Sequence, residues 1–162
     1  MKKRLNIITV AIDSPAAAGA GTQAKLIAKE YNLLYLDTGK IYRYIGKLSL
    51  NYKKKFNYSF IKRKINKIRF KDLNNKKLLT DEVATSASII SKDKKIRSIV
   101  KTFQHTCAYN PPMIYSGSVL DGRDITSVIM KKSMFKFYIT ANVKIRAKRR
   151  YLEYKKLNKQ IT

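Results

Sequence analysis

The sequence predicts a three-layer, doubly wound α/β domain with a parallel sheet. Three observations support this fold class. Short apolar runs rich in β-branched residues recur along the chain, they alternate with segments of helical periodicity, and the first run leads through a small-residue loop into a helix. The 162 residues are enough for one domain with a sizeable core, so we treat 1–162 as a single domain.

The first apolar run begins at Leu5 and ends at Ile12, as expected of a strand buried on both faces. Residues 13–21 are mostly small, with Pro and Gly, and a helical pattern begins at Thr22. A strand, a small-residue loop and a helix start form the layout of a phosphate-binding loop, in which backbone N–H groups and the helix dipole face an anion. The alternative interpretation is an Ala/Gly-rich turn in an ordinary α/β unit.

A second strand–helix pair follows. The first helix ends at about residues 30–32, an apolar strand covers 33–36, and Asp37-Thr38-Gly39 interrupts it. Apolar residues then recur at helical spacing from Ile41 to Leu48, with Gly46 inside the pattern. Because ligands of doubly wound sheets bind beyond the carboxyl ends of the strands, we expect both loops to contribute to one site.

The segment from 51 to 80 is rich in lysine and harder to assign. It predicts a helix near 58–65, followed by a short strand or loop. Thr80 or Asp81 can cap a helix that ends near Ile90, and a further helix is expected from about Ile96 until the Asn110-Pro111-Pro112 stop. Two interpretations of these lysines remain open: they form a nucleic-acid-binding face, or they belong to a solvated insert. Lysine-rich blocks are usually solvated, which favours the insert.

The last third returns to strands. A strand is expected over 113–120, and Asp121-Gly122-Arg123-Asp124 stands at its end. A further strand is predicted over 135–139, and Asn142 is the expected cap of a last helix that begins at about Val143.

The composition excludes several classes of protein. No run of 18 apolar residues occurs, and the basic start is not followed by a signal-peptide pattern. The single Cys107 allows no internal disulfide and suits a reducing cytoplasm. The formal charge is +26, and Lys is about three times as frequent as Arg, with abundant Asn, Ile and Tyr. This profile is typical of an AT-rich genome, so the scarcer arginines are the more informative cations.

Five segments in order resemble bacterial cytidylate kinase, a P-loop nucleoside monophosphate kinase. They are IDSPAAAGAGT, LDTGKIYR, EVATSASIISKDKKIR, DGRDITSVI and ITANVKIRAKRR. The resemblance implies phosphoryl transfer from ATP to CMP or dCMP, with Mg²⁺, in the cytoplasm. It also implies that residues at about 48–110 form a small CMP-binding insert, and that a lid region begins near residue 146.

The resemblance assigns roles residue by residue. Arg43 and Arg123 match arginines that bind the CMP phosphate, and Asp124, Ser88 and Arg97 match the residues that recognise the cytosine edge. Asp37 and Thr38 would order the acceptor loop. Arg123 and Asp121 are the catalytic candidates, and Asp121 would hold water on Mg²⁺. The predicted ATP-binding residues are Ser14, Pro15, Ala16, Ala17, Ala18, Gly19, Ala20, Gly21, Thr22, Arg146 and Arg150.

The sequence departs from the family pattern at several places. Ser14 replaces the first glycine of the loop, Ala20 replaces the phosphate-binding lysine, and Thr126 replaces a glycine. The family continues beyond the residue that ends this chain, so we expect an incomplete lid and a sheet that lacks its last strand and helix. The edge of the 135–139 strand would then invite self-association.

These departures leave alternatives to an active kinase. One is a nucleotide-binding remnant without catalysis, and another is a basic nucleic-acid-binding protein with the same fold. The expected partners are ATP, CMP and dCMP, with nucleic acid not favoured and no membrane. His105 and Cys107 are too few for a metal site, so we assign no metal ligands.

Overall fold

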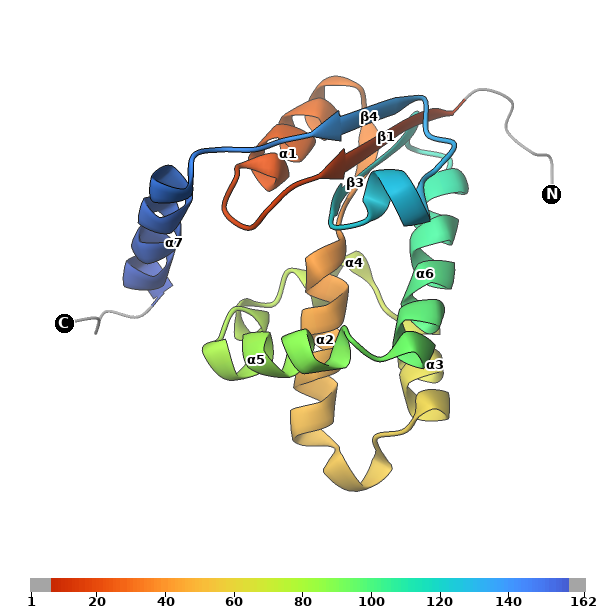
Figure 1. Cartoon of the computed structure of the whole chain (residues 1–162). Coiled ribbons are helices and arrows are strands. Elements are labelled where there is room, and N and C mark those ends of the chain that lie inside the picture. Colours follow the sequence, from red (N-terminus) through yellow and green to blue (C-terminus); the bar gives the residue numbers. More distant parts are fainter. Residues whose placement is uncertain (1–6, 158–162) are drawn as a thin grey trace. The chain divides into compact units, whose positions relative to one another are not determined.

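The structure, a computed structural model, describes residues 7–157 (Figure 1). Leu5, which the sequence placed in the first strand, lies outside the described residues. The chain divides into two compact units. The described residues up to Leu36 and from Pro111 onward form the first unit, and Asp37–Asn110 form the second.

The first unit contains a four-stranded sheet. Its strands are β1 (Ile8–Asp13), β2 (Leu33–Asp37), β3 (Gly117–Gly122) and β4 (Phe135–Tyr138), in the order β2-β3-β1-β4. Strand β1 pairs in parallel with both β3 and β4, with Ile8 opposite Gly117 and Val10 opposite Phe135. The predicted α/β class with a parallel sheet is confirmed, and Figure 1 shows β1 between β3 and β4.

Helix α1 (Ala20–Glu30) covers one face of this sheet. Its buried stripe of Ala20, Ala24 and Ala28 packs on Val10, Ile12 and Val119, and small side chains let the helix approach closely. The opposite face is equally buried, with Ala11 and Leu120 at 0% exposure. Burial on both faces explains the continuous apolar run in the sequence of β1.

Two boundaries and one element differ from the sequence prediction. Helix α1 begins at Ala20 rather than Thr22, because Gly19 serves as its N-cap. Strand β3 begins at Gly117 rather than residue 113, since Met113 and Ile114 are each 74% exposed in a turn after two prolines. The sequence did not predict η3 (Ile125–Ile129), a single π-helical turn that packs against β1 and β3.

The regular elements of the second unit, Asp37–Asn110, are all helices joined by short loops. They are α2 (Thr38–Asn51), η1 (Lys53–Lys55), α3 (Tyr58–Asn66), α4 (Phe70–Leu73), η2 (Lys76–Leu78), α5 (Asp81–Ile90) and α6 (Lys94–Tyr109). Of the two alternatives expected after α3, a short loop is found at residues 67–69, and α4 and η2 follow it. The helix predicted near 58–65 is confirmed as α3. Thr80 caps α5 by accepting a hydrogen bond from the backbone N–H of Val83 at 3.4 Å.

Gly46 allows α2 and α5 to cross at close range. A Cβ at this position would lie 2.9 Å from the backbone nitrogen of Ala87 and 3.0 Å from the carbonyl oxygen of Val83. The hydroxyls of Ser49 and Ser86 lie 2.8 Å apart at the same crossing. The glycine that weakened the helical pattern in the sequence is therefore explained by packing.

Helix α7 (Val143–Leu157) follows β4, and Asn142 accepts a hydrogen bond from the N–H of Lys144 at 2.9 Å, as its predicted capping role requires. In the described part of the chain, no helix has the length and apolarity needed to cross a bilayer. Cys107 is buried, and burial raises the pKa of its thiol to about 12.

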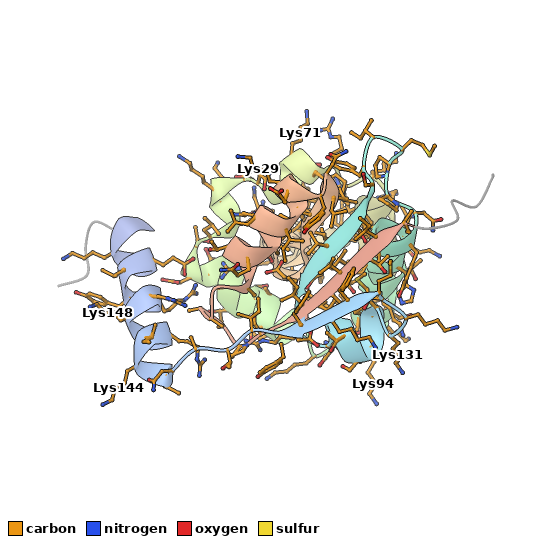
Figure 2. All side chains as sticks on the ribbon, turned by 90° about the horizontal axis from the view of Figure 1, so that it is seen from above. Lys29, Lys71, Lys94, Lys131, Lys144 and Lys148 are labelled. Atoms are coloured by element: carbon orange, nitrogen blue, oxygen red, sulfur yellow. The ribbon has the colours of Figure 1, made fainter. Side chains whose placement is uncertain are left out.

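The lysines are distributed over many elements. Figure 2 labels Lys29 on α1, Lys71 on α4, Lys94 on α6, Lys131 after η3, and Lys144 and Lys148 on α7. Because these cations come from elements of both units, they do not mark one element as a nucleic-acid-binding helix.

Candidate functional site

The loop from Ser14 to Thr22 joins the end of β1 to the start of α1. Ser14 donates its N–H to the carbonyl oxygen of Gly122 at 3.1 Å, which continues the β1–β3 pairing into the loop. Ala17 and Gly19 adopt left-handed backbone angles, with φ of 60° and 103°. Left-handed residues also occur in anion-binding nests, in which successive backbone N–H groups face one side.

Asp13, the last residue of β1, holds the segment that follows β3. Its carboxylate accepts hydrogen bonds from the N–H groups of Ile125 at 2.6 Å and Thr126 at 3.0 Å, and from the Thr126 hydroxyl at 2.5 Å. The phosphate-loop candidate and the Asp121–Asp124 turn therefore leave neighbouring strands at one edge of the sheet, where a single carboxylate connects them.

Arg123 and Asp124 lie in this turn with exposed side chains. Asp124 has φ 59° and ψ 20°, a left-handed conformation, and its carbonyl oxygen accepts the N–H groups of Val128 and Ile129 at 3.0 and 3.1 Å. Such a backbone is uncommon for residues other than glycine, although aspartate adopts it more readily than most, and sparsely populated conformations cluster at functional sites.

Asp121 is only 8% exposed and lies beside the start of α1. Its Oδ2 atom is 3.4 Å from the position that a Cβ on Gly21 would occupy, and the Tyr35 hydroxyl is 3.3 Å from the same position. A buried carboxylate next to the phosphate-loop candidate is an oxygen donor of the kind that Mg²⁺ prefers. Among the described residues, no three His, Cys, Asp or Glu side chains are grouped so that they could hold a metal ion by themselves.

Helix α7 brings two arginines onto the loop. The Arg149 Nη1 atom donates to the carbonyl oxygens of Ala18 at 2.9 Å and Ala17 at 3.4 Å. Arg146 Nη1 donates to the carbonyl oxygen of Ala16 at 3.5 Å. Arg150, which the sequence analysis paired with Arg146, forms a 2.8 Å ion pair with Glu153 on its own helix.

The remaining candidates lie in the second unit. Asp37 caps α2 by accepting the N–H of Lys40 at 3.3 Å, and Thr38 is 3% exposed. Arg43 is half-buried on α2, and its Nη1 atom donates to the carbonyl oxygen of Leu78 at 2.9 Å. This bond fixes the direction of the guanidinium within the unit.

Ser88 and Arg97 lie on successive helices of this unit. Ser88 is exposed on α5. Arg97 is half-buried on α6, where its Nη1 atom lies 3.5 Å from the carbonyl oxygen of Ser91. Each unit thus gathers its own set of candidates. The first carries the loop, Asp121, Arg123, Asp124 and the α7 arginines, and the second carries Asp37, Thr38, Arg43, Ser88 and Arg97.

Sequence reasoning missed Asp13, Tyr35 and Arg149 as parts of the first unit's site. Asp13 gave a usable signal, because a charged residue at the end of an apolar strand needs hydrogen-bond partners. The contact of Arg149 with the loop had no such signal, since more than 130 residues separate the two along the chain.

Comparison with known proteins gives one consistent family. A family model described as cytidylate kinase matches residues 10–162. A cytidylate kinase of Rhodopseudomonas palustris (strain ATCC BAA-98 / CGA009) is 38% identical over 148 residues, which are 89% of this chain and 66% of the relative. A cytidylate kinase of Bartonella quintana is 40% identical, over 93% of this chain and 69% of the relative. The corresponding figures for a cytidylate kinase of Clostridium tetani are 37%, 95% and 71%. The chain therefore spans about two thirds of the length of these relatives.

Proposed function

The chain belongs to the cytidylate kinase family, and from this premise we propose that it transfers a phosphoryl group from ATP to CMP or dCMP. The observation that carries the proposal is the sheet edge at which the Ser14–Thr22 loop and the Asp121–Asp124 turn leave neighbouring strands. Asp13 binds the segment that follows this turn, so the fold holds the two loops together.

In the proposed reaction, an oxygen of the CMP phosphate attacks the γ-phosphorus of ATP. The bond between that phosphorus and the oxygen bridging to the β-phosphate breaks, and its electron pair stays on that oxygen in ADP. The protein's contribution to such a transfer is positioning and charge stabilisation rather than covalent chemistry.

The donor side of the proposal uses the loop residues Ser14 to Thr22, with Arg146 and Arg150 of α7. The backbone N–H groups of the loop would bind the phosphates together with the start of α1. Mg²⁺ bound with ATP would neutralise charge on the transferred phosphoryl group. Asp121 would hold a water ligand of that ion.

The acceptor side assigns Arg43 and Arg123 to the CMP phosphate and Asp124, Ser88 and Arg97 to the cytosine edge. The Asp124 carboxylate would accept a hydrogen bond from the exocyclic amine of cytosine. Asp37 and Thr38 would order the start of α2, where the Asp37 cap already fixes the first turn. We place the reaction in the cytoplasm, because the single Cys107 of the sequence suits a reducing compartment.

The test is release of ADP from ATP with CMP, dCMP or UMP as acceptor. UMP presents an oxygen acceptor where cytosine has an amine, which would leave the Asp124 carboxylate unpaired at a cost of about 1–3 kcal/mol. We expect CMP to be favoured over UMP by about 5- to 150-fold in kcat/KM. The variant Asp124→Ala should abolish this preference, whereas Ser127→Ala in the same segment should keep it. Equal rates with CMP and UMP in the unmodified protein would contradict the role of Asp124, and no ADP release with any acceptor would contradict the proposed reaction.

A further inference from the structure

The phosphate-loop candidate, Ser14 to Thr22, carries no charged side chain of its own. A phosphate-binding loop ordinarily ends in a lysine that reaches the β- and γ-phosphates. From Ser14 to Thr22, this loop has only uncharged residues, and Ala20 stands at the lysine position with its side chain 4% exposed. Backbone N–H groups and the helix dipole then supply only partial positive charge.

A full positive charge nevertheless lies on the loop. The Arg149 Nη1 atom is 2.9 Å from the Ala18 carbonyl oxygen and 3.4 Å from that of Ala17. The same atom is 3.4 Å from the position of a Cβ on Gly19, the residue that precedes Ala20. A guanidinium has five N–H donors, and both of these contacts use one nitrogen, so the fork retains donors for a phosphate.

None of the other cations near the loop makes the contacts with Ala17 and Ala18 that Arg149 makes. The Lys25 ammonium lies over the Tyr35 ring, 5.9 Å from its centroid, and Arg150 is paired with Glu153 at 2.8 Å. Figure 2 shows Lys144 and Lys148 on helix α7, which also carries Arg149. Arg146 contacts the loop at its far end, through the Ala16 carbonyl oxygen at 3.5 Å.

We propose that Arg149 supplies from helix α7 the cation that the loop lacks at Ala20, and that its guanidinium binds the phosphates of the nucleotide donor. The assignment rests on the proposed function, because it takes a nucleoside triphosphate as the ligand of the loop. The contacts of Arg149 with the loop carbonyl oxygens hold the guanidinium in place before the nucleotide binds. Less entropy is then lost when the guanidinium contacts the phosphates.

The first experiment measures binding of ATP and of CMP by calorimetry, so that its result does not depend on turnover. Arg149→Ala should weaken ATP binding about tenfold and leave CMP binding within about twofold. The CMP measurement serves as a control, since structural damage would weaken the binding of both nucleotides. Arg149→Lys should retain part of the ATP affinity, since it keeps the charge but not the planar fork. Lys148→Ala is the matched control and should change neither affinity. An Arg149→Ala protein that binds ATP as the unmodified chain does would overturn the proposal, as would Arg149→Lys binding as poorly as Arg149→Ala.

The second experiment asks whether Arg149 and a lysine at position 20 perform the same task. In the Ala20→Lys background, Arg149→Ala should weaken ATP binding by less than about threefold, because the two cations would be redundant. An equal loss of ATP affinity in both backgrounds would refute the idea that Arg149 takes the place of the missing lysine. Ala20 is buried, so thermal melts first establish that Ala20→Lys folds, and if it does not, the Arg149 and Lys148 series decides alone. If all variants bind ATP as expected yet none phosphorylates CMP, the assignment of Arg149 holds and the proposed reaction fails. An unmodified chain that does not bind ATP overturns both.

Discussion

Removing the Asp13 carboxylate should destabilise the protein more than any other single truncation at the site. The carboxylate accepts the N–H groups of Ile125 and Thr126 and the Thr126 hydroxyl, and Ile125 is 0% exposed. In Asp13→Ala, each of the two backbone N–H groups loses a charged acceptor at a partly buried position. The loss of each bond should lower the free energy of unfolding by about 1.5 kcal/mol or more. The hydroxyl can rotate to another acceptor, so we expect a total loss of about 3 kcal/mol in the free energy of unfolding.

Two further variants separate the contributions. Asp13→Asn keeps one oxygen acceptor and should lose about 1–2 kcal/mol, whereas Thr126→Val removes only the hydroxyl contact and should lose about 1 kcal/mol. The sequence has no Trp, so urea unfolding is followed by far-UV circular dichroism at pH 7. An Asp13→Ala protein within about 0.5 kcal/mol of the parent would refute the reasoning, as would Thr126→Val that costs as much as Asp13→Ala.

Two other predictions concern the second unit. Gly46→Ala would place a Cβ 2.9 Å from the Ala87 backbone nitrogen, so α2 and α5 must separate; we expect a loss of about 1–3 kcal/mol in urea unfolding, and the idea fails if the variant is as stable as Lys47→Ala. Burial, together with Lys101, lowers the pKa of His105 below its usual 6.5. Below pH 6.5 the unfolded chain therefore binds the proton more readily, so the contribution of His105 to stability is complete above that pH and is lost as the pH falls. The melting temperature should drop less between pH 7.5 and 5.5 in His105→Gln than in the parent, and identical drops would contradict the assignment.

Local sequence patterns predicted most of the first unit because its elements follow simple periodicities. The β1 run is apolar throughout because both faces are buried, and the alanine stripe of α1 repeats at helical spacing. The turn at 113–116 was mistaken for a strand because Met113 and Ile114 are apolar but exposed. The π-helical turn at Ile125–Ile129 depends on Asp13, which lies 112 residues earlier than Ile125, so no local pattern could indicate it.

The candidate site was predictable to the extent that its residues form contiguous motifs. The loop, the Asp37 cap and the Asp121–Asp124 turn are all recognisable as short segments next to strand ends. Contacts between distant segments were not recognisable from the sequence. The clearest case is which of Arg146, Arg149 and Arg150 contacts the loop. Helical spacing favoured Arg146 and Arg150, but Arg149 makes the 2.9 Å contact with the loop, because the approach of α7 decides which side chain reaches it. The functional roles of these residues stay predictions until the variants are measured.

The left-handed backbone at Asp124 also restricts how this position can change by mutation. Apart from glycine, the residues that adopt φ near 59° most readily are asparagine and aspartate. Asparagine is one nucleotide change away from aspartate, and in an AT-rich genome the G-to-A transition that links their codons runs with the mutational bias. A drifting lineage would therefore replace the carboxylate first by an amide that keeps the turn but both donates and accepts hydrogen bonds. Under the role proposed for Asp124, such a change would remove base discrimination while the turn and the fold remain.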